Sequence, residues 1–437
     1  MYRSASLLAW ISLGAGALAG LVPKATTNKP VFAHYMVGGV LTEHCRQDIV
    51  DAQSLGIDAF AINYDQYAWW SNNTVNYLFD HADELGFKIF FSFDMSGDYF
   101  ATPSEYSQFL GDYIARDSYY TYNDVPLVST FGGESVTTDE WKDLRSAVGD
   151  ILIVPSFYQT PPSATFFDEY SELDGIFNWN SWPQIAEGKV YVPTAEDKTF
   201  QSAAQSSGKL FMMGVSPLQF KHMNTDNNWY RRGERNLEYR LGQVLSLQPD
   251  MIELQTWNDA GESHYMGNFW PEVITGDAIP AYTDGYNHTG YWEILPSFIQ
   301  AWKRGDTTTA NMVPTNGATA QGVFWHHTLL TTADCSSDQI GKPAGIENAS
   351  NAVQGIILVK EGQTGLTVSV WSGSTLLGTK KLVAGFNRFV FTKMTTGTVT
   401  AQVLNGEDVV VGASGPLAVV DTASVCNYNF QVVALSA

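Results

Sequence analysis

The segment TWNDAGESHY, residues 256–265, places two carboxylates three positions apart among aromatic, amide and histidine side chains. Asp259 and Glu262 could act as a proton donor and a proton acceptor, because acid/base catalysis needs carboxyl groups held in different protonation states. The same spacing suits a helix N-cap and its capping-box partner, which bond to each other's backbone. The residue types alone leave both interpretations open.

The elements that must position these residues are strands and helices in regular alternation between residues 30 and 304. Apolar runs typical of strands fall at 31–37, 57–64, 87–95, 126–134, 151–158, 173–180, 209–216 and 250–257. Helices are expected near 44–55, 73–85, 103–116, 138–147, just after 162, and at 195–207, 232–247 and 291–302.

Continuous apolar runs are typical of parallel strands buried on both faces. Eight strand–helix units over roughly 270 residues predict an α/β fold, a (β/α)8 TIM barrel spanning residues 30–304. A doubly wound open sheet is the alternative, although the sequence has no G-x-G-x-x-G phosphate turn.

The chain changes character after residue 304. Residues 305–322 are rich in Gly, Thr and Asn and predict a linker. Residues 323–437 hold short β-type segments separated by turn residues, which predicts a C-terminal β-sandwich domain.

In a (β/α)8 barrel, the active site lies at the carboxyl ends of the strands. Asp94 ends the third predicted strand, while Asp259 and Glu262 follow the eighth. These three residues are therefore the predicted catalytic carboxylates. Asp94 could instead cap the following turn, and Glu134, which ends the fourth run, suits either catalysis or simple solvation.

Amide, aromatic and histidine side chains gather at the same strand ends, with few Lys or Arg residues. Such a lining fits a neutral sugar better than a phosphate or a carboxylate. The alternatives are a turn residue for Asp65 and a core histidine for His34. The predicted substrate contacts are His34, Asn63, Asp65, Trp179, Asn180, Trp257, Asn258, His264 and Tyr265.

Composition and motifs argue against other functions. The chain has 24 basic and 45 acidic side chains and a net charge of -21, which disfavours nucleic acid and anionic membranes as partners. The sequence contains neither a G-x-S-x-G elbow nor an H-E-x-x-H zinc pair. We therefore predict hydrolysis by carboxylates without a metal or another cofactor.

The first 19 residues combine Arg3, an apolar stretch from Leu7 to Leu18 and an A-x-A signal, which predicts a secretory signal peptide and an extracellular protein. A membrane anchor is the alternative, but the run is shorter than the ~20 apolar residues that span a bilayer. Secretion permits N-glycosylation and disulfides. The predicted glycosylation sites are Asn72, Asn287 and Asn348, and the predicted disulfide joins Cys335 and Cys426, leaving Cys45 free.

Several stretches resemble glycoside hydrolase family 71, the α-1,3-glucanases or mutanases. They include VFAHYMVG, GFKIFFSFDM, GVSPLQFKH and LQPDMIELQTWNDAGESHYMG. The resemblance covers roughly residues 30–304 and continues more weakly through the tail. It implies endo-hydrolysis of α-1,3-glucan with inversion and without a metal, and essential roles for Asp94, Asp259 and Glu262. Ala260 departs from the family pattern, where an aromatic residue is expected.

Our mechanistic hypothesis makes Glu262 the general acid and Asp259 the base, with Asp94 adjusting their charge state and binding a hydroxyl. Inversion calls for carboxyl groups roughly 6.5–9.5 Å apart, so a closer pair would favour Asp94 as one partner. Two rival functions are a non-catalytic glucan-binding wall protein and a glycosidase with another linkage specificity. We also expect a monomer.

Overall fold

The computed structural model describes residues 29–97 and 99–436. The predicted signal peptide, residues 1–19, lies outside them. Among the described helices, none is long and apolar enough to cross a membrane.

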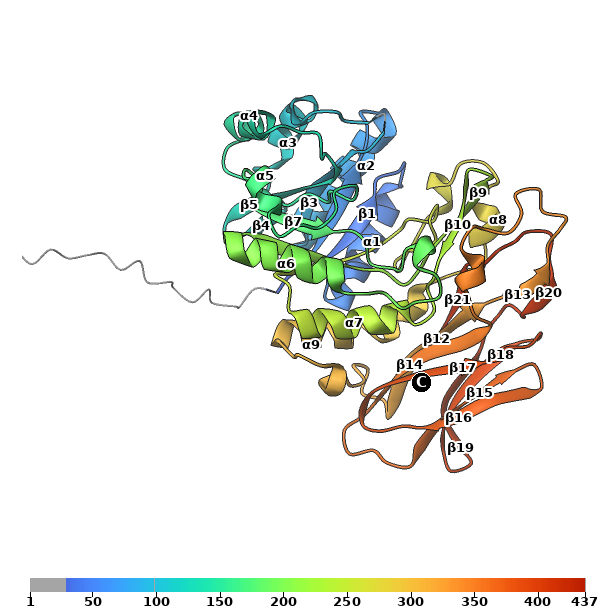
Figure 1. The fold of residues 1–437 in the computed structure, drawn as a ribbon. Coiled ribbons are helices and arrows are strands. Elements are labelled where there is room, and N and C mark those ends of the chain that lie inside the picture. Colours follow the sequence, from blue (N-terminus) through green and yellow to red (C-terminus); the bar gives the residue numbers. More distant parts are fainter. Residues whose placement is uncertain (1–28, 98, 437) are drawn as a thin grey trace, which may run out of the picture.

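The first part of the chain is a mixed α/β fold around one curled sheet (Figure 1). Each predicted apolar run contains one of its parallel strands. These are β1 (Val31–Met36), β2 (Ala59–Tyr64), β3 (Lys88–Met95), β5 (Val125–Gly132), β6 (Leu152–Ile153), β7 (Gly175–Asn178), β8 (Leu210–Val215) and β11 (Met251–Leu254). A short strand, β4 (Thr121–Tyr122), pairs antiparallel with β5.

The order of hydrogen-bonded neighbours in the sheet is β6-β5-β3-β2-β1-β11-β8-β7. Sequential strands of this sheet are thus neighbours, and its first strand, β1, pairs with its last, β11. The two end strands also meet, because Asp174 N donates to Ile153 O at 2.9 Å and Phe177 N donates to Pro155 O at 2.8 Å. The carboxyl ends of all these strands therefore face one common region.

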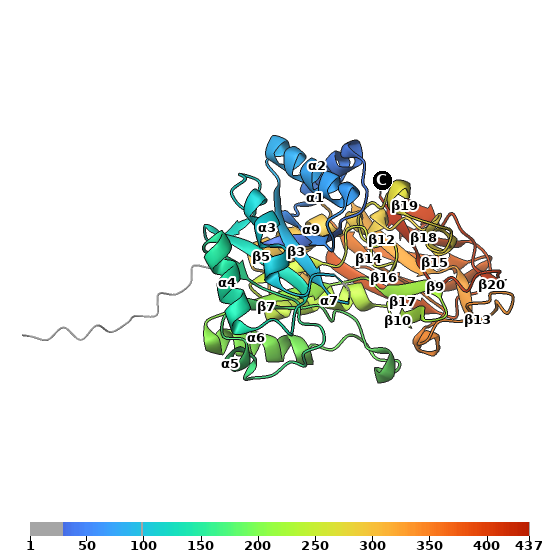
Figure 2. The ribbon, with the colours of Figure 1, turned by 90° about the horizontal axis from the view of Figure 1, so that it is seen from above.

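Helices lie outside the curled sheet (Figures 1 and 2). They are α1 (Thr42–Leu55), α2 (Trp69–Leu85), α3 (Ser107–Tyr113), α4 (Thr138–Val148), α5 (Phe166–Glu169), α6 (Ala195–Ser207), α7 (Asn236–Leu247), α8 (Pro280–Thr283) and α9 (Leu295–Arg304). Short 3₁₀ turns are η1 (Pro103–Glu105), η2 (Ile185–Glu187), η3 (Pro271–Val273), η4 (Thr289–Glu293), η5 (Thr309–Asn311) and η6 (Ile346–Asn348).

A β-hairpin precedes α7, between the predicted strand at 209–216 and the predicted helix at 232–247, where the sequence analysis predicted no element. It consists of β9 (Gln219–Asn224) and β10 (Asn227–Arg231). The Asn224 side chain closes its turn by accepting from the backbone N–H groups of residues 226 and 227, at 3.0 and 2.9 Å.

The C-terminal part contains two four-stranded antiparallel sheets. One has the order β17-β14-β12-β21, with β12 (Ala320–His327), β14 (Ala352–Val359), β17 (Gly385–Thr392) and β21 (Phe430–Leu435). The other has the order β16-β15-β18-β19, with β15 (Leu366–Ser372), β16 (Thr375–Lys381), β18 (Val399–Asn405) and β19 (Asp408–Ser414). A small parallel pair joins β13 (Leu329–Asp334) to β20 (Val420–Thr422).

Two details of this part bear on the sequence predictions. Strand β12 begins at Ala320, inside the predicted linker 305–322, so the sheet starts earlier than the expected boundary at 323. The structure joins Cys335 to Cys426 by a disulfide with Cα atoms 5.5 Å apart, and Cys45 is a buried free thiol.

The two parts of the chain share a core. Alternate residues of a strand point to opposite faces. In β12, Trp325 belongs to the same apolar cluster as the first sheet, whereas Phe324 belongs to the cluster that fills the space between the two C-terminal sheets. In β14, Ile356 likewise belongs to the cluster of the first sheet, and Ile357 belongs to the cluster between the two C-terminal sheets. One face of this sheet therefore packs on the α/β part.

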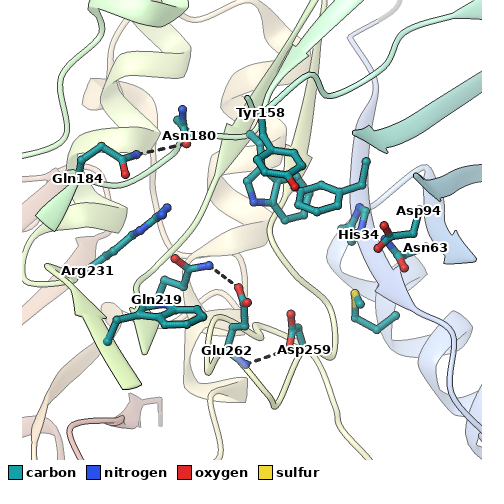
Figure 3. A pocket seen from close by; sticks show the side chains of 14 residues that line it. His34, Asn63, Asp94, Tyr158, Asn180, Gln184, Gln219, Arg231, Asp259 and Glu262 are labelled. Atoms are coloured by element: carbon teal, nitrogen blue, oxygen red, sulfur yellow. Dashed lines mark hydrogen bonds between the residues drawn. The ribbon is translucent and has the colours of Figure 1, made fainter. Parts of the chain in front are cut away.

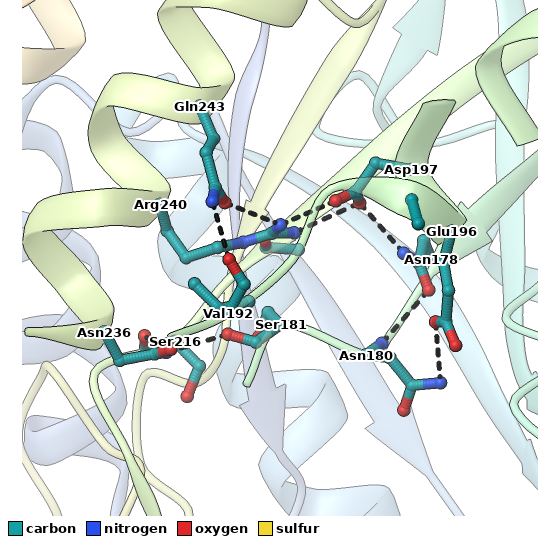
Figure 4. A network of polar contacts seen from close by, with 12 residues as sticks. Asn178, Asn180, Ser181, Val192, Glu196, Asp197, Ser216, Asn236, Arg240 and Gln243 are labelled. Carbon is teal, nitrogen blue, oxygen red and sulfur yellow. Dashed lines mark hydrogen bonds and ion pairs between the residues drawn. The ribbon is translucent and has the colours of Figure 1, made fainter. Parts of the chain in front are cut away.

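A buried ionic network ties helices α6 and α7 to strands β7 and β8 (Figure 4). The Arg240 guanidinium donates to Asp197 at 2.7 and 3.2 Å and to the Gly214 carbonyl at 2.7 and 3.1 Å. Asp197 also accepts from Asn178 Nδ2 at 2.9 Å, and Asn178 Oδ1 accepts from Asn180 N at 3.2 Å. The network thereby fixes the segment that leaves β7.

We predict that Arg240→Leu lowers the free energy of unfolding by about 3–5 kcal/mol, because it leaves the Asp197 carboxylate buried without its cation. Urea unfolding measures the loss. The control is Arg46→Leu, which removes an exposed pair with Glu84 (3.4 Å) and should cost no more than about 1 kcal/mol. Equal losses in the two variants would contradict the role given to the network.

Candidate active site

A cavity of about 530 Å³ opens at the carboxyl ends of the strands (Figure 3). It brings together the three predicted catalytic carboxylates and four of the predicted contact residues. The predicted residues that line it are Asp94, Asp259, Glu262, His34, Asn63, Trp179 and Asn180. The remaining lining residues are Met36, Phe131, Tyr158, Gln184, Gln219, Trp229 and Arg231.

Asp259 and Glu262 lie in the turn that follows β11. Asp259 Oδ1 accepts from Glu262 N at 2.9 Å, which is the bond that an N-cap makes. No helix follows between residues 257 and 270, and Asp259 N donates to Thr256 Oγ1 at 2.8 Å rather than to Glu262. The helix-cap interpretation is therefore wrong: the bond closes a turn that presents both carboxylates to the cavity.

His264 hydrogen-bonds to the Asp259 carboxylate. Its Nε2–H donates to Asp259 Oδ2 at 3.0 Å, and the same nitrogen lies 3.8 Å from Glu262 Oε2. Burial raises the pKa of Asp259, but the hydrogen bond and charge of His264, the Glu262 N–H and the charge of Lys221 outweigh burial. The net pKa of Asp259 is below its usual value, so this group is held as a carboxylate.

The hairpin β9–β10 holds Glu262 from the other side. Gln219 Nε2 donates to Glu262 Oε2, and Lys221 Nζ lies 3.4 Å from Oε1. The backbone takes part as well, because Phe220 N donates to the Glu262 carbonyl at 2.9 Å. Glu262 thus has donors on both oxygens while still lining the cavity.

The carboxylates of Asp259 and Glu262 are close together. One oxygen of each, together with a ring nitrogen of His264, lies within 4.8 Å of the others. That distance is below the roughly 6.5–9.5 Å expected of an inverting pair. By distance alone the three side chains could hold a cation, but the Lys221 ammonium, 3.4 Å from Glu262 Oε1, already supplies positive charge there.

Asp94 lies across the cavity, beside His34 and Asn63 (Figure 3). Its Oδ1 accepts from Ser96 N at 2.9 Å and from Ser96 Oγ at 2.6 Å, and its Oδ2 accepts from Asn63 Nδ2 at 3.3 Å. This polar group, at the ends of β1, β2 and β3, is suited to hydrogen-bonding a ligand rich in hydroxyls.

Aromatic rings form another wall. Tyr158 stacks on Phe131 with ring centroids 4.5 Å apart, and Phe131 meets Trp179 edge-on at 4.8 Å. Trp229 lines the cavity from the hairpin. Flat apolar faces beside polar groups are what an amphipathic ligand such as a sugar needs.

Five predicted contact residues do not line the cavity, contrary to the prediction. Their neighbours in the folded chain explain why. Trp257 is buried beneath Gly267, where an added Cβ would stand 2.2 Å from the indole ring. The Asn258 side chain is bound to the backbone of Met36. Its Oδ1 accepts from Met36 N–H at 2.7 Å, and its Nδ2 donates to the Met36 carbonyl at 3.0 Å.

The other three are Asp65, His264 and Tyr265. Tyr265 is buried, stacks on His288 at 4.0 Å and donates to the Tyr286 carbonyl. Asp65 lies beyond the last residue of β2, where the chain turns towards α2. His264 is fully buried and acts on Asp259 instead of on a ligand.

Glu134, for which the sequence leaves catalysis and simple solvation open, lies outside the cavity. It lines a separate hollow with Trp141 and Tyr170. Its Oε1 accepts from Gln159 N at 2.8 Å. The solvated interpretation of this residue thus fits the structure better than the catalytic one.

The predicted glycosylation sites differ in accessibility. Asn348 is buried, and its Nδ2, the atom that would carry a glycan, donates to the Ile185 carbonyl at 3.1 Å. Asn72 lies within α2 and accepts from the Tyr64 hydroxyl at 2.5 Å. The environment of Asn348 argues against a glycan in the folded protein, whereas Asn72, whose Nδ2 is not used in that bond, and the exposed Asn287 stay predicted sites.

Sequence reasoning missed the four hairpin residues Gln219, Lys221, Trp229 and Arg231. The signal was present: alternating residues on both sides of the NTDNN turn are typical of a hairpin. The hairpin is anchored to the C-terminal part, where Tyr230 N donates to Ala344 O at 2.8 Å. That long-range contact has no local sequence signature.

Comparison with known proteins places the chain in a family. The chain is 29% identical to the glucan endo-1,3-alpha-glucosidase agn1 of Schizosaccharomyces pombe, covering 94% of this chain and 95% of that protein. It is 30% identical to the mutanase Pc12g07500 of Penicillium rubens, covering 96% and 92%. A solved GH99 endo-alpha-mannosidase of Bacteroides thetaiotaomicron is similar at 15% identity and a TM-score of 0.49, covering 63% of this chain and 97% of that one. The profile of glycosyl hydrolase family 71 matches residues 27–437, and the chain belongs to this family.

Proposed function

We propose that this protein is a secreted, endo-acting hydrolase of α-1,3-glucosidic bonds in α-1,3-glucan. The observation that carries the proposal is the pair Asp259 and Glu262, presented by one turn to a cavity with aromatic and polar walls. Membership of family 71 and the names of the relatives, a glucan endo-1,3-alpha-glucosidase and a mutanase, support the linkage.

In the proposed mechanism, Glu262 donates its proton to the glycosidic oxygen as the C1–O bond breaks. Asp259 takes a proton from the water whose oxygen attacks C1. The lowered pKa of Asp259 supports its role as the base, because a base must be ionised before the reaction. Asp94, Asn63 and His34 would bind hydroxyl groups of the sugar, and Phe131, Tyr158 and Trp179 would pack against its ring.

Inversion is part of the proposal, but Asp259 and Glu262 lie closer together than an inverting pair should, which makes Asp94, across the cavity (Figure 3), the rival partner for one of them. Proton NMR of the first product tests inversion: initial release of the β-anomer supports attack by water from the opposite face. Initial release of the α-anomer would contradict inversion and would fit a closely spaced pair that retains configuration.

We further propose that the curled sheet is a closed (β/α)8 barrel and that the C-terminal sheets form a β-sandwich. The sequential strand order and the two backbone hydrogen bonds between the end strands support the barrel, and a doubly wound sheet would not have this order. The apolar cluster between the two C-terminal sheets supports the sandwich. Secretion rests on the N-terminal sequence, and the monomeric state stays a prediction.

We predict that Asp259→Asn and Glu262→Gln each lower kcat on α-1,3-glucan by about 10²–10⁴-fold, because each removes a proton-transfer group. Asp94→Asn should also be strongly impaired. Reducing-sugar release on a panel of α-1,3-, α-1,4- and β-1,3-glucans measures both activity and linkage. Glu134→Gln, outside the cavity, is the control and should keep wild-type activity.

Retention of activity in all three carboxylate variants would contradict the catalytic assignment. Binding of α-1,3-glucan by the wild type without any hydrolysis would favour a non-catalytic binding protein. Preference for another glucan would contradict the linkage.

We predict that His264→Gln moves the acid limb of the kcat/KM pH profile to higher pH. An amide can still donate to Asp259 but carries no charge, so the pKa of Asp259 should rise and the carboxylate should be lost at a higher pH as the solution is acidified. Near neutral pH, where Asp259 stays ionised, activity should change less. An acid limb that stays in place or moves to lower pH would show that His264 does not set this ionisation.

A further inference from the structure

A buried glutamate lies behind the cavity wall and contacts one of the lining residues. Glu253 of β11 accepts from His34 Nδ1–H of β1 at 2.8 Å, between strands that pair in parallel. Both side chains are about 1% exposed. Glu253 does not line the cavity, and the mechanism above gives it no role.

Among the residues that the structure describes, none is a hydrogen-bond partner of the other ring nitrogen of His34, Nε2. His34 Nε2 is fully buried in the free protein, although the residue lines the cavity. Buried polar atoms are nearly always hydrogen-bonded, so an orphaned atom at a cavity wall marks a place for a ligand. Asn63 and Asp94 lie beside His34 (Figure 3), and the ring of Trp179 packs edge-on against His34 with ring centroids 4.9 Å apart.

The partner of one ring nitrogen decides what the other can do. An imidazole that donates from Nδ1 to a carboxylate is kept in the Nδ1–H tautomer, which leaves a lone pair on Nε2. Without Glu253, the ring would be free to take the other tautomer or to rotate. The Glu253 carboxylate therefore sets the orientation of the His34 ring and makes Nε2 an acceptor rather than a donor.

We propose that Glu253 is a positioning residue that holds His34 with Nε2 as an acceptor for a sugar hydroxyl in the cavity. The inference rests on the proposed function for the identity of the ligand, a glucose unit of an α-1,3-glucan. The contact between Glu253 and His34 is a separate claim and has a separate readout.

Binding is measured by calorimetry with soluble α-1,3-gluco-oligosaccharides in a Glu262→Gln background, which prevents turnover. Loss of one hydrogen bond should weaken Kd about tenfold in Glu253→Leu and in His34→Ala. The double variant should bind no more weakly than either single variant, because Glu253 acts through His34. Glu253→Gln keeps an acceptor for Nδ1–H and should restore most of the affinity.

The matched control is Glu238→Leu, which removes another buried glutamate, paired with Arg235 and outside the cavity. It should leave Kd within about twofold of the background. Thermal unfolding of every variant identifies losses that come from destabilisation alone.

The tautomer of His34 is read directly by ¹⁵N NMR of histidine-labelled protein, without any ligand. We expect the Nδ1–H form in the wild type and a changed pattern in Glu253→Leu. An unchanged pattern would overturn the role of Glu253. A changed pattern with unchanged Kd, or additive losses in the double variant, would overturn the hydroxyl contact. If the Glu262→Gln protein binds no α-1,3-oligosaccharide while the NMR pattern changes as expected, the proposed function fails and the positioning role stands.

Discussion

The hydrogen bond from His264 to Asp259 is the contact on which the site depends. It joins the two ends of the turn after β11, so that a residue five positions further along the chain holds the carboxylate in place. His264 is buried while Asp259 still lines the cavity, and the hydrogen bond and charge of the imidazole favour the ionised form of Asp259. The bond from Glu262 N to the other oxygen of Asp259 then fixes Glu262 beside it. These contacts hold Asp259 as a carboxylate, which a general base requires.

The rest of the fold supports this turn from three directions. The pairing of β1 with β11 places His34 and the polar group around Asp94 opposite the two acids. The network around Arg240 holds the segment that carries Trp179 and Asn180. The hairpin β9–β10 brings donors to Glu262 and is itself fixed by the C-terminal part, where His222 Nε2–H donates to Asp338 at 2.8 Å. The C-terminal sheets thus help to shape the cavity even though none of their residues lines it.

Much of this architecture could be read from the sequence. Every predicted apolar run contains a strand of the curled sheet, because burial on both faces leaves a pattern that needs no tertiary information. The position of Asp94, Asp259 and Glu262 after strands was enough to bring them to one cavity. Proximity in sequence was a poor guide to side-chain direction, however: Trp257 and Tyr265 are buried in the core, and the Asn258 side chain bonds to the backbone of Met36 in β1. The hairpin itself has a local pattern, but its place beside Glu262 and the contact of Glu253 with His34 depend on distant segments, which leave no local pattern.

The central claim is that Asp259 and Glu262 flank the bond that is broken, while Asp94 binds the sugar. A crystal structure of the Glu262→Gln variant with an α-1,3-gluco-oligosaccharide bound across the cavity tests it most directly. The account predicts that the side chain at position 262 lies within hydrogen-bonding distance of the glycosidic oxygen, with Asp259 facing a water near C1 and Asp94 bonded to hydroxyl groups. A complex in which Asp94 faces the glycosidic oxygen or the attacking water, with Asp259 remote from C1, would contradict it.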